Sequence, residues 1–386
     1  EYFSQAAAGA TSAVQQGLLS GTTFYWKVYA VSEGALSTGF ASGNATTTAC
    51  TGTGGITRTW IGSGSGGSST NFNLSTNWSP NGTPSCADSL VMVLTSGTII
   101  SLSSSIEIGA INTSISGSEN VFRLNTGAHS LQVNGTAYFN VASGNNNTQV
   151  QINVEDGGSI TYNRSATFSA AVGGNFPVLG IGGTTGIITF KGDVTFNVGC
   201  QENILDQPDK VIFDGMGTQT LTCNNTGFYM FLGRTSTEIG STNNPTVILA
   251  GSTFSTPYGN LNINGTSTLD LSTNTFNRYA SGGTITLAAS ATLKLSGSTG
   301  GQTGSNFPSN FTTFSFAPTS NVYYNSASGV NQTIYNGPAY GNLILSNKTG
   351  SGSTTKSATG NLSVVGNFTI NDTYTTFNAG TSLNHS

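Results

Sequence analysis

The sequence has few charged residues and only two histidines. Asp, Glu, Lys and Arg make up 7% of its 386 residues, against roughly 25% in an ordinary soluble domain. The 11 Lys and Arg residues are scattered and form no basic stripe. This argues against a nucleic-acid partner, because phosphate binding needs clustered cations. No apolar run approaches about 18 residues, so the sequence predicts no transmembrane segment.

The shortage of histidine also argues against catalysis. The two histidines are His129 and His385, and because His385 is at the terminal end, a Ser-His-Asp or Cys-His site would depend on His129 alone. His129 lies in TGAHSLQV, which is typical of a turn that enters a strand. The neighbouring acids Glu155 and Asp156 would point to opposite sides of a strand end, as in a solvated turn. We therefore predict a protein that is not an enzyme and has no catalytic residues.

Aromatic residues are plentiful, and they separate this chain from a disordered polar linker. The sequence is 36% apolar and contains 21 Phe and 13 Tyr, whereas disordered linkers are poor in aromatic residues. Apolar and polar residues alternate in short runs, such as 131–133 and 150–154. Alternation of this kind predicts half-buried strands. No stretch shows helical periodicity, so we predict an all-β fold.

Weak internal repeats run through residues 90–386. Gly-Asn-Leu recurs at 259–261, 341–343 and 360–362, and the segment 211–221 parallels 322–334. A unit with one apolar face must stack on its neighbours to bury that face. We therefore predict a parallel β-solenoid (β-helix). With about 20–25 residues a rung, it makes roughly 12–15 rungs and a rod of roughly 60–70 Å.

Residues 1–49 differ from this pattern. The segment LLSGTTFYWKVYAV at 18–31 alternates as a half-buried strand does, and it resembles the late strands of fibronectin type III domains. The matching residues are Leu18, Gly21, Thr22, Phe24, Trp26, Val28 and Ala30. The resemblance implies the C-terminal half of a β-sandwich. Its early strands would lie upstream of Glu1 or come from another chain.

Residues 50–89 form a Gly- and Ser-rich linker and an entry segment. This segment resembles one found before repeat arrays in large exported surface proteins of Bacteroidetes bacteria. The matching residues are Thr59, Trp60, Gly62, Asn77, Trp78, Pro84, Asp88 and Val91. The resemblance implies an adhesin or filament protein exported by type IX secretion. Asp88-Ser89-Leu90 also resembles a short O-glycosylation motif of such proteins, which makes Ser89 a candidate site.

Four cysteines in a polar β-rich chain favour disulfides in an oxidising compartment. Cys200 and Cys223 are 23 positions apart, close to one estimated rung. Stacked rungs would place their Cα atoms about 5 Å apart, within reach of a disulfide. We predict this bridge, and a Cys50–Cys86 bridge that staples the linker to the entry segment.

Two further groups of side chains are candidates for binding. An acidic cluster contains Asp206, Asp209 and Asp214 and could supply oxygen ligands to calcium, with a solvated polar loop as the alternative. No Asp-x-Asp-x-Asp-Gly loop occurs, and we predict no other metal site or cofactor. Exposed rings could contact a sugar, and the candidates are Trp60, Trp78 and Tyr324, with core packing as the alternative.

Taken together, these features predict a structural or adhesive segment of a secreted cell-surface or extracellular filament protein. The expected location is outside the cell, associated with a bacterial outer membrane. Its expected partners are other surface or matrix proteins, glycans, or further copies of itself. One alternative is a carbohydrate-binding or polysaccharide-cleaving β-solenoid. Another is a self-assembling fibre subunit whose fibronectin-like half is completed by strand exchange.

Overall fold

The structure is a computed structural model, and it confirms the all-β fold. It describes residues 23–32, 35–46, 50, 55–117, 121–143, 148–154, 156–170, 176–179, 185–197, 208–224, 233–251, 254–256 and 259–380. These residues form 36 strands and one short 3₁₀ helix, η1 (Ser75–Asn77). No helix among them is long and apolar enough to cross a membrane.

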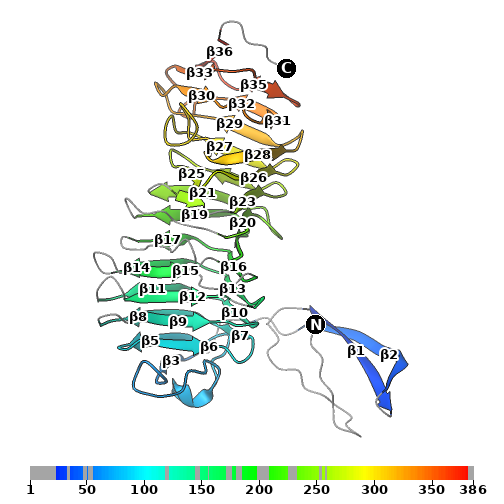
Figure 1. The fold of residues 1–386 in the computed structure, drawn as a ribbon, viewed down its shortest axis with the longest axis vertical. Helices are drawn as coiled ribbons and strands as arrows, with labels where there is room; N and C mark the ends of the chain where they lie inside the picture. The colour runs from blue at the N-terminus through cyan, green and yellow to red at the C-terminus, as the bar shows by residue number, and fades with distance from the viewer. Residues whose placement is uncertain are drawn as a thin grey trace.

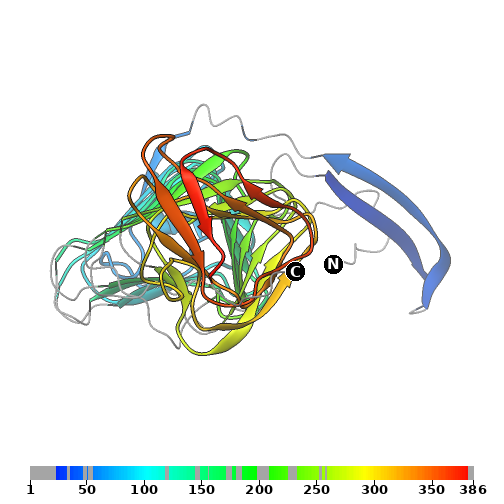
Figure 2. The same ribbon diagram turned by 90° about the horizontal axis from the view of Figure 1, so that it is seen from above.

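The chain winds into a parallel β-solenoid, as the repeats predict (Figure 1). Successive strands lie on three faces of the coil, and each strand pairs in parallel with one on the next turn. Figure 2, turned to look along the rod, shows the strands wrapped around a common interior. Parallel stacking gives every rung a neighbour on which to bury its apolar side.

The first face is a fourteen-stranded sheet, and the second is a nine-stranded sheet. The first face comprises β3 (Thr57–Trp60), β4 (Trp78–Ser79), β5 (Ser89–Leu94), β8 (Ala110–Ile115), β11 (Ala137–Val141), β14 (Ala166–Ala170), β17 (Val194–Phe196), β19 (Thr218–Cys223), β21 (Thr246–Gly251), β24 (Thr268–Asp270), β27 (Thr292–Leu295), β29 (Asn321–Tyr324), β32 (Asn342–Leu345) and β35 (Phe368–Ile370). The second comprises β7 (Ile106–Ile108), β10 (Ser130–Val133), β13 (Ser159–Tyr162), β16 (Ile187–Phe190), β18 (Lys210–Phe213), β20 (Ser236–Ile239), β23 (Asn260–Ile263), β26 (Gly282–Leu287) and β28 (Phe311–Phe316).

The third face is interrupted and consists of smaller sheets. It comprises β6 (Thr98–Ser101), β9 (Val121–Asn125), β12 (Gln149–Asn153) and β15 (Phe176–Leu179), then β22 (Phe254–Thr256) and β25 (Phe276–Arg278), then β30 (Gln332–Ile334), β33 (Thr354–Ala358) and β36 (Thr375–Asn378). A further parallel pair, β31 (Ala339–Tyr340) and β34 (Ser363–Val364), lies between the third and first faces in chain order.

The rungs are unequal in length. On the first face Leu90 pairs with Ile111, 21 positions later, whereas Ala137 pairs with Ala166, 29 positions later. Several rungs are therefore longer than the predicted 20–25 residues. The turns absorb the difference, because the strands of the first face other than β4 still stack in continuous parallel register.

Two columns of stacked aromatic rings fill the interior of the middle rungs. Adjacent rings within each column are 5.0 to 5.7 Å apart and nearly parallel. The columns are Phe139, Phe168 and Phe196 on the first face, and Tyr162, Phe190 and Phe213 on the second. Equal register positions on consecutive rungs bring these rings together, since neighbouring parallel strands are about 4.8 Å apart.

The segments 211–221 and 322–334, which are similar in sequence, share a structural feature, a buried glutamine. Each amide nitrogen, on Gln219 and on Gln332, donates to two backbone carbonyls of the preceding rung. Each amide oxygen accepts a backbone N–H from the turn that precedes the glutamine. We call this three-bond arrangement the glutamine bracket. It satisfies backbone groups at a corner of the coil, where the ladder of strand hydrogen bonds is interrupted.

Strands β1 (Thr23–Ser32) and β2 (Ala35–Thr46) pair antiparallel and stand beside the rod (Figure 1). Trp26 and Val28, expected to face a sandwich core, are 46% and 59% exposed. Two strands cannot enclose a core of their own. The fibronectin type III-like half therefore stays a prediction, and residues 1–22 of it lie outside the described residues.

Tyr162 is the one ring of the two columns that carries a hydroxyl group, and this hydroxyl has no hydrogen-bond partner among the described residues. Burial raises the pKa of Tyr162, so the hydroxyl stays neutral. We expect Tyr162→Phe to increase the free energy of unfolding by about 1 kcal/mol, because it removes a buried polar atom without a partner. Chemical denaturation of the two proteins measures this difference.

The matched control is Tyr324→Phe. The hydroxyl of Tyr324 is equally buried, but it lies 3.0 Å from the Tyr340 hydroxyl and accepts the Tyr335 N–H at 3.0 Å. Removing it leaves both groups without this partner, so we expect a loss of about 1 kcal/mol or more. Equal effects of the two substitutions would contradict the difference between the two sites.

Candidate functional site

The N-terminal end of the rod is closed by a cap. The two-residue strand β4 pairs antiparallel with β3, and Trp78 lies opposite Trp60 at the end of the first face. The rings of Trp60 and Phe72 both meet Trp78 edge-on, at 5.0 and 5.2 Å. All three side chains are buried. The cap covers the apolar interior that the first rung would otherwise expose to water.

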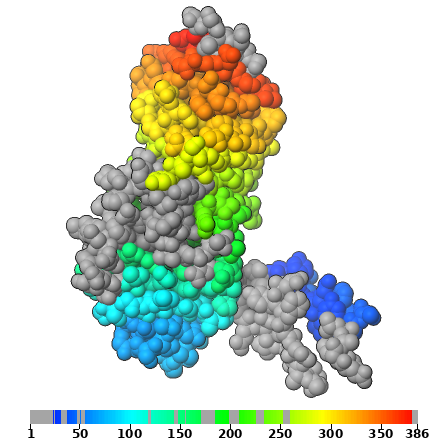
Figure 3. Space-filling model, in the orientation of Figure 1, coloured from blue at the N-terminus to red at the C-terminus, as the bar shows by residue number. Residues whose placement is uncertain are grey.

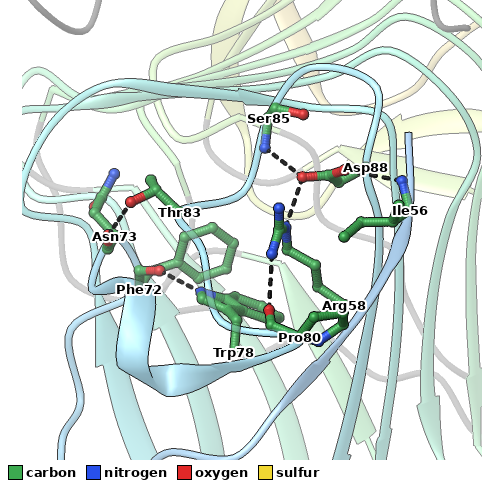
Figure 4. A network of polar contacts seen from close by, with 9 residues as sticks. All are labelled: Ile56, Arg58, Phe72, Asn73, Trp78, Pro80, Thr83, Ser85 and Asp88. Atoms are coloured by element: carbon green, nitrogen blue, oxygen red, sulfur yellow. Dashed lines mark hydrogen bonds and ion pairs between the residues drawn. The ribbon is translucent and has the colours of Figure 1, made fainter. Parts of the chain in front are cut away.

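A buried carboxylate ties the cap to the first rung (Figure 4). Asp88 accepts Nε–H of Arg58 at 2.7 Å and the backbone N–H groups of Ile56 and Ser85 at 3.0 and 2.9 Å. Arg58 also donates from Nη1 to the carbonyl of Pro80, 2.7 Å away. Burial alone would raise the pKa of Asp88, but these hydrogen bonds outweigh it and lower the pKa below its ordinary value.

Other residues of the entry motif hold the loops of the cap. Trp78 donates from its indole nitrogen to the Phe72 carbonyl at 2.8 Å, and Asn77 donates from Nδ2 to the Asn71 carbonyl at 2.7 Å. A Cβ at Gly62 would lie only 2.7 Å from a backbone oxygen and closer still to the Trp60 ring, so no side chain fits there. The motif residues therefore build the cap, a role that their spacing alone does not indicate.

The three rings proposed for sugar contact are in the core. Trp60 and Trp78 are 1% exposed and Tyr324 is 0% exposed. Their faces pack against other side chains and cannot lie against a sugar ring. This corrects the sugar-contact hypothesis in favour of core packing, because the alternation of these strands points all three inward.

The Cys50–Cys86 disulfide is confirmed, with Cα atoms 5.9 Å apart. It ties the segment that follows the hairpin to the cap. Cys223 is buried on β19, and its register neighbour on the preceding rung is Phe196, 27 positions earlier. Cys200 lies outside the described residues. The Cys200–Cys223 bridge therefore stays a prediction.

The acidic cluster is partly visible. Asp214 accepts three consecutive backbone N–H groups, from residues 241–243, at 2.8 to 2.9 Å on a single carboxylate oxygen. Asp209 accepts the Thr235 hydroxyl, and Asp206 lies outside the described residues. The described residues contain no group of three or more His, Cys, Asp or Glu side chains placed for a metal ion. Calcium binding stays a prediction.

Two surface features remain at the positions that the sequence indicates. Ser89 is exposed at the start of β5, and its O-glycosylation stays a prediction. His129 follows the turn that enters β10, as predicted.

Near Asp214, a polar hollow of about 180 Å³ opens on the second face, lined by Thr161, Thr189, Lys191, Ile212, Asp214, Ser241 and Thr242.

The C-terminal end of the rod differs from the N-terminal end. Phe368 and Ile370 of β35 are register neighbours of Leu343 and Leu345, which are fully buried one rung earlier. At the last rung these two positions are 42% and 45% exposed, and Val365 beside them is 63% exposed. Figure 3 shows these last rungs, in orange and red, at one end of the rod.

No family model, curated protein or solved structure matches this chain. The fold defines a class of architecture, the parallel β-solenoid, and that class contains both structural proteins and enzymes.

The contacts of the cap predict that the stability of the protein depends on Asp88. We expect Asp88→Asn to lower the free energy of unfolding by about 3 kcal/mol, because it leaves the largely buried Arg58 without its carboxylate. The pKa of Asp88 is lowered in the folded state, so its contribution is present above pH 3.8 and is lost as the pH falls through the lowered value. Denaturation at neutral pH measures the loss.

The control is Glu238→Gln on β20. Glu238 pairs with Lys210 at 3.2 Å, but the Lys210 side chain is 38% exposed. We expect this substitution to change the free energy of unfolding by less than about 1 kcal/mol. If Asp88→Asn has as small an effect, the carboxylate does not secure the cap.

Proposed function

We propose that this chain is a structural or adhesive segment of a secreted cell-surface or filament protein, and not an enzyme. The observation that carries the proposal is a continuous buried core along the whole rod, from Trp60 in the cap to Leu362 near the last rung. Such a core gives length and stiffness, which a stalk or fibre requires.

A location outside the cell is supported by the Cys50–Cys86 disulfide, because structural disulfides persist in oxidising compartments. The entry motif supports a Bacteroidetes-type exported surface protein, since its residues act together as the cap of a repeat rod. Export by the type IX route is part of the same proposal. Both points rest on the resemblance of residues 50–91.

The contact surfaces of the proposal are the outer faces of the rod. The outer faces carry columns of Thr at equal register positions, for example Thr218, Thr246, Thr268 and Thr292. Hydroxyl groups repeated at about 4.8 Å offer many equivalent hydrogen bonds to a matrix protein or a glycan. The proposed partners are therefore extended surfaces and polymers.

Adhesion and catalysis are separated by one pair of assays on the full chain. We expect beads coated with the protein to be retained under flow on matrix-protein or glycan surfaces. We expect no release of reducing ends or unsaturated products from a polysaccharide panel. A heat-unfolded sample is the control for both assays. Release of sugar products by the folded protein would contradict the structural proposal.

The carbohydrate alternative has one specific observation in its favour, the polar hollow on the second face. If a glycan binds there, Lys191→Ala should weaken binding, because Lys191 lines the hollow. Lys348→Ala is the matched control, since Lys348 is exposed and lies far along the chain, in the loop after β32. Equal binding by both variants would remove the hollow as a sugar site.

The apolar side chains exposed on the last rung that the structure describes are the observation behind self-assembly as a second candidate function. A strand of another copy, such as one of its hairpin strands, would cover Phe368 and Ile370 and pair with the free edge of β35. We expect the mass measured by light scattering to rise with concentration. Ile370→Lys should suppress this rise, because a lysine would be desolvated in the contact.

Ile99→Lys is the matched control for the assembly experiment. Ile99 is 49% exposed on β6, close to the 45% of Ile370, but it does not lie on the last rung. We expect it to leave the association unchanged. A mass that stays monomeric at every concentration, or equal effects of the two lysines, would rule out assembly through this end.

A further inference from the structure

A lysine is buried near the C-terminal end of the rod. Lys356 lies on β33, and its side chain is 0% exposed. Its Nζ is 2.5 Å from the Ser326 hydroxyl oxygen and 2.7 Å from the amide oxygen of Gln332. No carboxylate of the described residues lies within ion-pair distance of it. A buried ammonium group without a counter-ion is costly.

The register holds this lysine against a glutamine. Lys356 and Gln332 are direct neighbours on the parallel strands β33 and β30, and both point into the rod. Gln332 is 2% exposed. The two side chains therefore stay together, away from water, for as long as these rungs are folded.

The amide of Gln332 belongs to one of the two glutamine brackets. Its Nε2 donates to the carbonyls of Leu295 and Gly297 at 3.0 and 2.8 Å, and its oxygen accepts the Ser326 N–H at 3.2 Å. These bonds fix the plane of the amide. The Ser326 N–H is also a donor aimed at the oxygen on which negative charge would develop if the amide carbon were attacked.

The other bracket provides an internal comparison. Gln219 makes the same bonds, but its neighbour on the next rung is Val247. Its oxygen accepts the backbone N–H of Gly215 at 2.6 Å, and no lysine shares it. The bracket therefore needs no amine to form. At Gln332 the amine is an addition to a complete structural unit.

We propose that Lys356 and Gln332 join in an intramolecular isopeptide bond. The Nζ lone pair attacks the side-chain amide carbon of Gln332, and the bond from that carbon to Nε2 breaks. Nε2 leaves as ammonia and takes up the proton that Nζ loses, and the Ser326 hydroxyl oxygen, which accepts the hydrogen bond of Nζ, is the first acceptor of that proton. The products are one secondary amide and one ammonia molecule, with no oxidant, reductant or co-reactant.

Three features favour this reaction at this place. Burial lowers the pKa of Lys356 to about 7, although the charge of Asp372 acts in the opposite direction, so the nucleophilic neutral amine is populated near neutral pH. Exclusion of water prevents competing hydrolysis of the amide. Fixed proximity replaces a bimolecular encounter with an intramolecular one, which lowers the entropic part of the barrier.

The bond would strengthen the C-terminal rungs that the structure describes. It would close a loop between positions separated by 24 residues and tie β30 to β33 covalently. Cross-linking reduces the conformational entropy of the unfolded chain. It also removes a buried charge. This inference does not depend on the adhesive function.

The test is the mass of the intact, purified protein. We expect a mass lower by one ammonia than the sequence requires, after the mass change of the disulfide is taken into account. Proteolysis should yield one branched peptide that joins the segments around Gln332 and Lys356. Lys356→Val, which copies the arrangement at Gln219, and Lys356→Arg should both have their full sequence mass.

An unmodified wild-type mass, with no branched peptide, overturns the proposal. In that case Lys356 is a free amine whose folded pKa of about 7 lies below the ordinary value of 10.5. The unfolded chain then binds more protons between these values, so the free energy of unfolding rises with pH across them. A cross-linked protein lacks this rise, and denaturation at several pH values gives a second, independent readout.

Discussion

Each rung of this rod has an apolar side that stays out of water only while another rung or a cap covers it. In the middle of the rod this condition is met by repetition, and the columns of Phe and Tyr rings are its result. At the first rung the cap takes the place of a neighbouring rung. Two tryptophans, a phenylalanine and a buried ion pair close the N-terminal end. At the other end Phe368 and Ile370 remain exposed.

The sequence was sufficient to predict the solenoid but not the details of its coil. Alternation within strands and the need to stack them indicated the fold. The length of each rung was harder to predict, because loops of different size separate strands that keep the same register. The Gly-Asn-Leu repeats illustrate this, since Asn260 begins a strand of the second face and Asn342 one of the first. A similar sequence thus marks a strand start without marking a position on the coil.

The roles of single side chains were predicted less well, for a physical reason. The sequence around Trp60 and Trp78 is compatible both with rings that bind sugar and with rings that pack in a core. Only the fold shows that they are buried. The Cys50–Cys86 bridge was predictable because the sequence already distinguishes the two segments that it joins, the linker and the entry segment. The glutamine brackets show the limit most clearly. The repeat that contains them is visible in the sequence, but the carbonyls they bind belong to another rung.

Buried charge is the least expected feature of a chain with so few charged residues. At the cap the charge of Arg58 is balanced by Asp88, so burial there has a structural explanation. Lys356 has no carboxylate of the described residues at ion-pair distance. Packing does not explain it either, because Val247 occupies the equivalent place beside Gln219 and the bracket is intact. A valine would fill the position at lower cost. A residue that breaks a local rule without a structural gain points to chemistry, and the amine of Lys356 lies against the side-chain amide of Gln332.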